Sequence, residues 1–331
     1  MDAKITKLRL SRMFSYDWIK MILFSAVAII VWTLVFTMTA TRITPAQQFT
    51  VFNYAGNTTL SNKFYSHFSN ALDNGVFSYE VIETTNNDLT TAQDYMYTVL
   101  EARLTTNEGD VLYVSLENDP SSEYMDGEEK KYLSYYETFL RRWYYNVKRL
   151  DGENGYFAQL EAYLNGFYKN GYEDADSLNT QLVENAFRAR IKENKDKRFK
   201  KESEIAKGVQ DEIARIQSYR DALVDFYAYL DAGYISFTDT KIAGNEEGKY
   251  VLEGQYAINI CPNVETMGKL QEYVSYRKTY EDENGDVQYK TTAENMQIVF
   301  LDVLPDSQQI FIGENLLYLN NVIETYCTAL Q

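Results

Sequence analysis

The hydrophobic pattern near the amino end differs from that of the rest of the chain. Residues 21–41, MILFSAVAIIVWTLVFTMTAT, contain no charged side chain. A hydrocarbon core of roughly 30 Å needs about 20 apolar residues, so this run predicts a transmembrane helix. Basic residues from Lys4 to Lys20 precede it, and the positive-inside rule places such a flank in the cytoplasm. We therefore expect a cytoplasmic tail at 1–20, a single-pass signal anchor at 21–41 and an extracytoplasmic body on the cell membrane.

A cleaved signal peptide is the alternative interpretation of this run. The apolar part of a signal peptide usually covers about 7–15 residues, and this run is longer. Thr37 and Thr39 are small enough to allow cleavage before Ala40. The length favours an uncleaved anchor.

The first part of the body alternates between strand-like and helix-like patterns after a short tether. Apolar residues at Leu60, Phe64 and Phe68 have helical spacing, and the flanking runs alternate as strands do. Strands are expected at 49–56, 77–84 and 110–116, and helices at 59–73 and 90–106, the second capped by Thr90 or Thr91. This β-α-β-α-β order predicts a parallel sheet.

The middle of the chain, 122–232, is helical by pattern. It contains two aromatic-faced helical segments, 132–150 and 155–168. A charged stretch follows, in which apolar residues from Val209 to Leu230 keep near-heptad spacing, as in a helical hairpin. Strands return at 233–242, 249–260 and 296–304, with a short helix at 265–273, a β-hairpin turning at Asn284-Gly285 in a type I′ turn, and a final helix at 307–330. We expect an α/β fold, with one lobe at 48–121 and 233–331 and a helical lobe at 122–232.

The charge of the chain excludes one class of partner. The net charge is −16 for the whole chain, whereas residues 42–331 alone carry −19. An acidic body repels phosphates, so no nucleic-acid partner is expected. The chain is rich in tyrosine, with 29 residues, which suits a surface needing rigid, half-polar contacts. Cys261 and Cys327 could pair in an oxidising compartment, or both could be buried small apolar groups.

Signals for catalysis are nearly absent from the sequence. His67 is the one histidine, and the chain contains neither HExxH nor GxSxG, so zinc hydrolases and nucleophile-elbow hydrolases lack their parts. We expect no enzyme activity, no cofactor and no metal site.

A basic run at 188–201, RARIKENKDKRFKK, holds eight Lys or Arg against two acids. Outside the cell it could contact anionic wall polymers or lipid headgroups. Alternatively, it is a solvated helix tip that acidic neighbours balance.

The candidate ligand site lies at the carboxyl ends of the expected parallel strands. Loops converge there and helix amino ends face them, which is why open parallel sheets bind ligands at that edge. The expected ligand-binding residues are Tyr54, Asn57, Thr84, Asn86, Glu117 and Asp119. Ordinary polar connections would give the same composition.

Several phrases carry a family resemblance: GDVLYVS after the second helix, then QYAINI, MQIVFLDVLPDSQQ and ENLLYLNNVIETY near the end. Over about 48–119 and 250–328 the order of elements resembles the extracellular solute-binding proteins of ABC importers. The resemblance implies a periplasmic-binding-protein-like domain whose two lobes close on a sugar, peptide or similar solute and then dock on a permease. Members of that family are usually lipid-anchored or free, whereas this chain has a membrane helix.

Two functions follow from these patterns. The first is membrane-anchored capture of a carbohydrate or other neutral polar solute for an ABC importer. The second is a non-catalytic envelope scaffold or partner-docking subunit that uses its long helices. A binder should contain one concave, aromatic-lined pocket between its lobes, whereas a scaffold should have a filled cleft and an exposed apolar face at 205–232.

Overall fold

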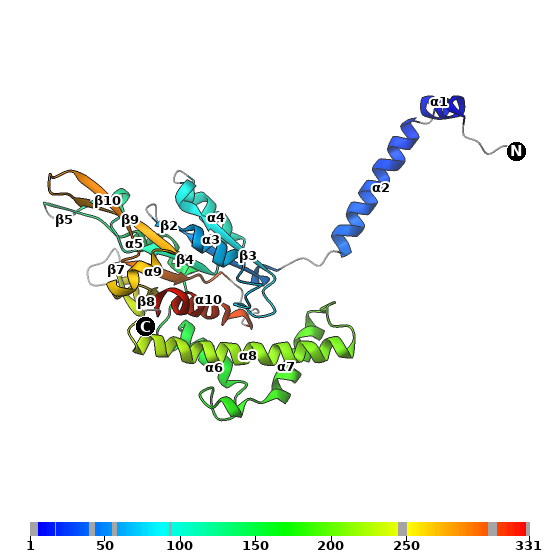
Figure 1. The fold of residues 1–331 in the computed structure, drawn as a ribbon. Coiled ribbons are helices and arrows are strands. Elements are labelled where there is room, and N and C mark those ends of the chain that lie inside the picture. The colour runs from blue at the N-terminus through cyan, green and yellow to red at the C-terminus, as the bar shows by residue number, and fades with distance from the viewer. Residues whose placement is uncertain are drawn as a thin grey trace. The chain divides into compact units, whose positions relative to one another are not determined.

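The computed structural model describes residues 6–16, 18–39, 44–54, 58–92, 95–126, 128–243, 250–303 and 310–328. The chain divides into two compact units, residues 1–44 and residues 45–331. Figure 1 shows the helices and strands of both units.

The first unit consists of two helices, α1 (Lys7–Tyr16) and α2 (Trp18–Thr39). Within the described residues, 18–37 is the one segment that is long and apolar enough to cross a membrane. The 22 residues of α2 give a length of about 33 Å at 1.5 Å per residue, which matches a hydrocarbon core. The predicted N-terminal apolar helix is therefore present, and it begins a few residues earlier than expected.

The body is built on a six-stranded mixed sheet. The strands, in spatial order, are β3 (Glu83–Asp88), β1 (Gln48–Asn53), β4 (Val111–Ser115), β11 (Met296–Phe300), β8 (Tyr250–Asn259) and β7 (Ser236–Ala243). The strand β1 pairs in parallel with both β3 and β4, as the β-α-β-α-β pattern predicts. The strands β11, β8 and β7 each pair antiparallel to their neighbour.

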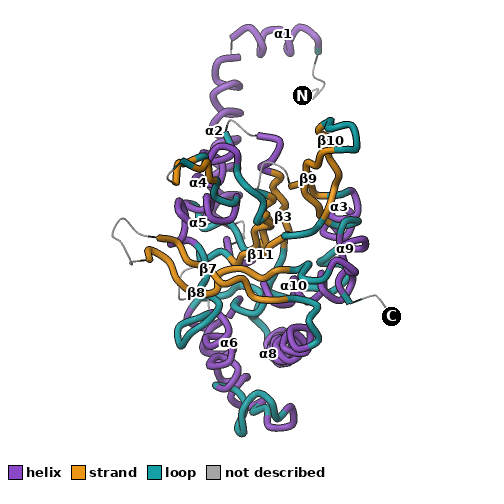
Figure 2. The backbone as a smooth tube through the Cα atoms, turned by 90° about the vertical axis from the view of Figure 1, so that its left-hand side faces the viewer, coloured by secondary structure: helices purple, strands orange, loops and turns teal. Residues whose placement is uncertain are grey.

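Alternate residues of each central strand feed two cores, one on each face of the sheet. Val111 and Tyr113 of β4 pack into one core, and Leu112 and Val114 into the other. The first core is covered by α3 (Asn62–Ser69), α6 (Tyr156–Asn165), α8 (Glu202–Asp231) and α10 (Glu314–Val322), and the second by α4 (Met96–Thr105) and α5 (Tyr135–Trp143). Figure 2 shows α4 and α5 on one side of this sheet and α6 and α8 on the other.

The helical middle does not separate from the sheet. Its helices α6 and α8, with α7 (Thr180–Glu193), contribute Leu160, Ile216 and Val183 to the same core as Phe49 of β1. Residues 45–331 consequently form one compact unit. The structure is α/β, as expected, but the two-lobed periplasmic-binding-protein-like arrangement is not confirmed.

Two smaller sheets complete the body, one of three strands, β10 (Val287–Thr292), β9 (Val274–Glu281) and β2 (Thr58–Leu60), and one of two, β5 (Tyr124–Asp126) and β6 (Glu129–Lys131). The predicted hairpin at Asn284-Gly285 is confirmed, but its turn is not type I′. The backbone N–H of Gly285 donates to Asp282 at 2.9 Å, and Gly285 alone of the turn has a positive φ, +79°. A three-residue loop with glycine in the left-handed region gives this geometry.

Several predicted boundaries were wrong. Residues 77–82 form turns rather than a strand, and the strand β3 follows them. The helix α4 begins at Met96 after a 3₁₀ turn at Leu89–Ala92, so neither Thr90 nor Thr91 caps it. The short helix α9 spans Val264–Leu270, and the final helix, α10, continues as a π-helical turn to Cys327.

Both cysteines are buried as thiols. The Sγ of Cys327 donates to the carbonyl of Ile260 at 3.4 Å. Burial raises the pKa of Cys327 to about 12, with a further increase from Cys261. The two residues therefore serve as small core groups, as one of the two interpretations of the sequence expected.

Candidate functional site

A pocket of about 290 Å³ opens beside the sheet. It is lined by Tyr144, Tyr145, Val147, Lys148, Arg149, Asn154, Tyr156, Gln159, Leu252, Tyr256 and Asp302. These residues come from the segment after α5, from α6, from β8 and from the chain after β11. Four tyrosine rings with amide and charged groups between them form a lining of the kind that holds small polar ligands.

The pocket lies at the edge of the sheet where the parallel strand β4 begins. The backbone N–H of Lys148 donates to the carbonyl of Phe300 at 2.9 Å, and that of Leu301 donates to Asp110, just before β4. The segment after α5 thus lies alongside the end of β11 and is hydrogen-bonded to it. This edge is opposite to the carboxyl ends of β1 and β4, where the sequence placed the site.

Lys148 is the less exposed of the two cations in the pocket, with a side chain that is 19% exposed, compared with 48% for Arg149. Its Nζ lies 3.8 Å from Oδ1 of Asp302 and 5.8 Å from the centre of the Tyr156 ring. Burial lowers the pKa of Lys148, and the carboxylates of Asp302 and Asp110 partly offset this effect. The Lys148 amine therefore lies close to the carboxylate of Asp302, and it can donate hydrogen bonds into the pocket.

Asp110 is buried, and its carboxyl group is near enough to Lys148 for their charges to interact. Its Oδ2 accepts a hydrogen bond from the backbone N–H of Thr50 at 2.7 Å. Burial raises the pKa of Asp110 to about 7, despite this hydrogen bond and the opposing effect of Lys148. A carboxyl group near Lys148 is thus poised to change its charge near neutral pH.

Arg149 and Asp151 form a fixed pair at the pocket wall. Nε and Nη2 of Arg149 donate to the two carboxylate oxygens of Asp151 at 2.8 and 3.0 Å, and the backbone N–H of Gln255 donates to Oδ1 at 2.9 Å. Gly254 has φ +141°, and a Cβ there would lie within 2.9 Å of both side chains. Because Gly254 has no Cβ, strand β8 can approach the ion pair closely. The opposite charges of Arg149 and Asp151 cancel each other.

The tyrosines of the pocket differ in how firmly they are held. Tyr156 is buried, and its hydroxyl donates to the carbonyl of Ile312 at 2.7 Å. By contrast, Tyr144 is 42% exposed and Tyr145 is 66% exposed, with ring centres 5.7 Å apart in an edge-to-face contact. Tyr156 therefore forms part of the rigid floor, and the adjacent rings of Tyr144 and Tyr145 offer open aromatic surface.

The predicted site residues lie elsewhere. Tyr54 and Asp119 are both buried at the carboxyl edge of the sheet, near enough for Asp119 to add to the increase in the pKa of Tyr54 that burial causes. The Tyr54 ring packs against Trp143 at 6.0 Å, and the carboxylate of Asp119 caps a 3₁₀ turn by accepting from Ser121 N–H at 2.9 Å.

Three other predicted residues that the structure describes, Thr84, Asn86 and Glu117, have different partners. Thr84 and Asn86 lie within β3, paired with Phe49 and Val51, because the strand starts later than predicted. Glu117 accepts from the hydroxyl of Tyr276 at 3.2 Å and from Asn295 at 3.3 Å. Asn57 lies outside the described residues. Ligand contact by these six positions stays a prediction.

The pocket residues were missed because the sequence pattern assigned 132–150 to one aromatic-faced helix. The helix α5 ends at Trp143, and the next residues, YYNVKR, turn two tyrosines and two cations toward the pocket. Adjacent tyrosines beside a Lys-Arg pair are the local signal that could have located it. Among the described residues no three His, Cys, Asp or Glu side chains are grouped as a metal site requires.

Comparison with known proteins found no matching family model, no similar curated protein and no similar solved structure.

Proposed function

We propose that this chain is a single-pass membrane protein whose extracytoplasmic body captures a carbohydrate or other neutral polar solute in the tyrosine-lined pocket. The observation that carries the proposal is the pairing of exposed aromatic surface, Tyr144 and Tyr145, with the hydrogen-bonding side chains of Asn154, Gln159 and Lys148 in one concave site. Sugars present apolar ring faces and a rim of hydroxyls, so they need both kinds of group.

The charges of the pocket favour a neutral ligand. Arg149 is neutralised by Asp151 in a bidentate pair, and Lys148 lies 3.8 Å from Asp302. Each cation in the wall thus has its own anion. A multiply charged solute would lose its hydration without gaining an unpaired counter-charge.

The membrane anchor in the proposal is α2, which is apolar enough to span. Delivery of the solute to an ABC permease extends the proposal, and its support is the resemblance to solute-binding proteins in the order of the elements predicted along the chain and in phrases such as GDVLYVS.

The scaffold alternative is less well supported, because the long helix α8 has its apolar face covered. Val209, Ile216, Leu223 and Phe226 are buried in the core. Over 205–232, all of which the structure describes, Val224 is the exposed large apolar residue. One such side chain does not make a docking face.

The test is thermal unfolding of the full-length chain in detergent against a panel of neutral mono- and oligosaccharides. A sugar present at 100 times its Kd should stabilise the protein by about 2.7 kcal/mol, which raises the midpoint. Tyr145→Ala should abolish the shift, whereas the control Tyr289→Ala should retain it, because Tyr289 is 62% exposed on the β10 hairpin.

Two outcomes would contradict the proposal. One is a midpoint that no sugar in the panel moves. The other is a shift that survives Tyr145→Ala and is lost in Asp119→Asn, which would move the site to the carboxyl edge that the sequence predicted.

A further inference from the structure

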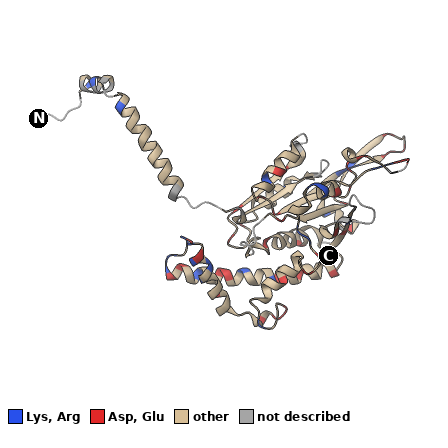
Figure 3. Cartoon of the chain, turned by 180° about the vertical axis from the view of Figure 1, so that it is seen from behind, with Lys and Arg blue, Asp and Glu red and all other residues tan. Residues whose placement is uncertain are grey.

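The turn between α7 and α8 is the cationic part of an acidic body. Residues 188–207 contain nine Lys or Arg and four Asp or Glu, a net charge of +5, whereas residues 42–331 carry −19. Figure 3 shows this concentration of charged residues where the two helices meet.

The arginines of this turn are committed to the fold. Arg190 pairs with Glu80 at 3.1 Å and with Glu212 at 2.8 Å, and Arg198 pairs with Glu80 at 3.1 Å. Glu80 and Glu212 are both buried, so these ion pairs hold the turn against the body. Arg188 is likewise paired, with Glu184 and Glu202.

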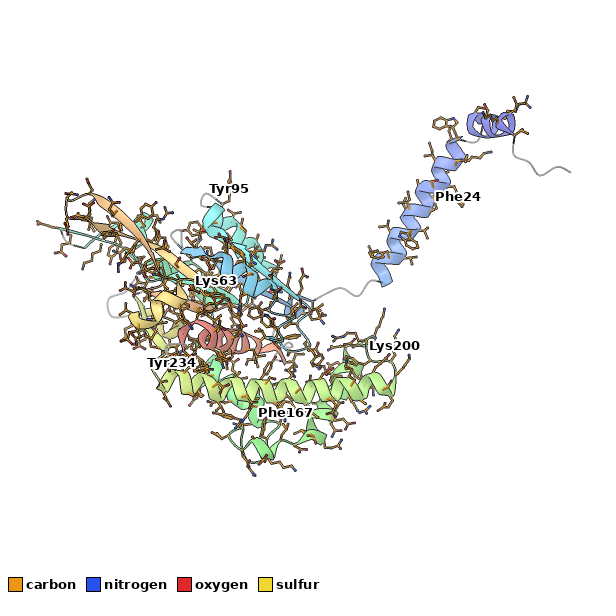
Figure 4. All side chains as sticks on the ribbon, in the orientation of Figure 1. Phe24, Lys63, Tyr95, Phe167, Lys200 and Tyr234 are labelled. Carbon is orange, nitrogen blue, oxygen red and sulfur yellow. The ribbon has the colours of Figure 1, made fainter. Side chains whose placement is uncertain are left out.

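The lysines of the same turn, unlike its arginines, do not hold the turn against the body. All six are exposed, and they form no ion pair with the described part of the chain; they are Lys192, Lys195, Lys197, Lys200, Lys201 and Lys207. We refer to this set as the lysine tip. In Figure 4 Lys200 lies at the amino end of α8, and Tyr234 lies beyond its carboxyl end. The fold thus presents a group of ammonium charges to solvent on a rigid support.

The lysine tip is fixed beside the residues where the body begins. The carbonyl of Gln47 accepts from the backbone N–H of Ile82 at 2.8 Å, and Glu80, two residues earlier, holds both Arg190 and Arg198. The first strand of the body, β1, starts at Gln48. The ion pairs of Glu80 therefore tie the tip to the start of the body.

Covalent geometry limits how far this part of the body can lie from the membrane helix. The helix α2 ends at Thr39 and the body starts at Pro45. Six Cα–Cα steps of at most about 3.6 Å reach roughly 20 Å. Electrostatic attraction to a charged surface decays over about 8–10 Å at physiological salt, and a tether of this length allows the lysine tip to approach a headgroup layer to within that distance.

We infer that the lysine tip binds the anionic headgroups of the membrane in which α2 is embedded. The inference rests on the membrane anchor in the proposed function and is independent of the pocket. Clustered lysines near a bilayer are attracted to anionic lipids, while the acidic remainder of the body is repelled. The contact consequently orients the body on its short tether. A soluble polyanion would also attract the lysine tip. The tether, however, keeps the tip near the membrane at all times, so the anionic lipid headgroups are the favoured partner.

The experiment uses the full-length chain reconstituted into vesicles, with a donor fluorophore on Ser203→Cys and acceptor-labelled lipid headgroups. Ser203 is exposed in the first turn of α8, and the natural cysteines, Cys261 and Cys327, are buried. Vesicles of phosphatidylcholine alone are compared with an equal mixture of phosphatidylcholine and phosphatidylglycerol. We expect higher energy transfer in the anionic vesicles and loss of the increase in high potassium chloride.

A matched pair of triple variants tests which lysines are responsible. The tip variant is Lys195→Gln, Lys197→Gln and Lys200→Gln, and the control variant is Lys169→Gln, Lys269→Gln and Lys290→Gln, all of them exposed. The tip variant should lose the increase in energy transfer on anionic lipid, and the control variant should keep it.

Equal energy transfer in both kinds of vesicle, or equal loss in both variants, would overturn the inference. So would protection of the tip lysines from acetylation by soluble polyphosphate but not by anionic vesicles, because that result would assign the site to a soluble polyanion. The sugar-induced thermal shift should be unchanged in the tip variant, so failure here and failure of the pocket proposal are separate results.

Discussion

The buried ion pair of Glu212 and Arg215 on α8 provides a stringent test of the packing between the helical middle and the sheet. The Arg215 side chain has no exposed surface and that of Glu212 is 5% exposed, with Nη2 donating to Oε1 at 2.6 Å. Arg215 also donates to the Tyr163 hydroxyl at 2.7 Å and to the Ile310 carbonyl. Burial disfavours the ionised Glu212, but the nearby guanidinium groups outweigh burial and lower its pKa.

Arg215→Leu should lower the free energy of unfolding by about 3–5 kcal/mol, because it leaves a buried carboxylate with one guanidinium partner fewer. Glu212→Leu should cost a similar amount. The double variant should cost clearly less than the two singles together, because apolar replacement of both partners removes the charges that burial penalises. Arg190 and Tyr79 also contact Glu212, at 2.8 and 2.9 Å, so some penalty remains in the double variant.

The assay is denaturant unfolding of the full chain in detergent. Trp143 is buried in the second core and reports unfolding once Trp18 and Trp32 of the first unit are replaced by Phe. Single variants within about 0.5 kcal/mol of the wild type, or strictly additive effects in the cycle, would refute the reasoning, because either result means that this pair is hydrated.

Two further predictions concern residues at the start of β4. Because burial raises the pKa of Asp110 from 3.8 to about 7, the folded state binds the proton more tightly than the unfolded state, and stability should fall as pH rises across that window. Asp110→Asn should therefore gain stability relative to wild type by up to about 1.4 kcal/mol per pH unit there, measured as midpoints at several pH values; parallel curves would exclude the shift. Gly109→Ala should cost about 2–5 kcal/mol, because backbone strain at φ +136° is added to the overpacking of a Cβ that would lie 2.8 Å from Phe52. Gly233→Ala, with φ +74° and open space around it, should cost only the backbone strain of about 1–2 kcal/mol, so equal losses in the two denaturation curves would argue against the contact.

The local pattern of hydrophobic and polar residues did not predict the position of β3, for a physical reason. This strand is at the edge of the sheet, and its sequence, ETTNND, is polar, because an edge strand is held by backbone hydrogen bonds on one side and need not bury both faces. The apolar residues before it, which predicted a strand, belong to turns, and Phe77 and Val81 there fill the core instead. Burial, rather than strand formation, explains their hydrophobicity.

The sequence by itself determined those features of the structure that depend only on residues close together in the chain. The membrane-length helix follows from an uncharged run, and the strands β1 and β4 follow from apolar segments buried on both faces of the sheet, since such patterns reflect local solvation. The hairpin at Gly285 follows from a glycine that can adopt a positive φ.

Tertiary structure alone decided where the pocket and the lysine tip lie. The pocket joins Tyr145 and Lys148 to Tyr256 and Asp302, which lie far from them along the chain, and the local run YYNVKR does not show which distant residues complete the site. The lysine tip can be recognised only in the folded structure, because buried Glu80 and Glu212 form ion pairs with arginines of the basic run and the lysines stay in solvent. Long-range pairing of this kind is set by the packing of whole elements, and no local pattern of hydrophobic and polar residues encodes it.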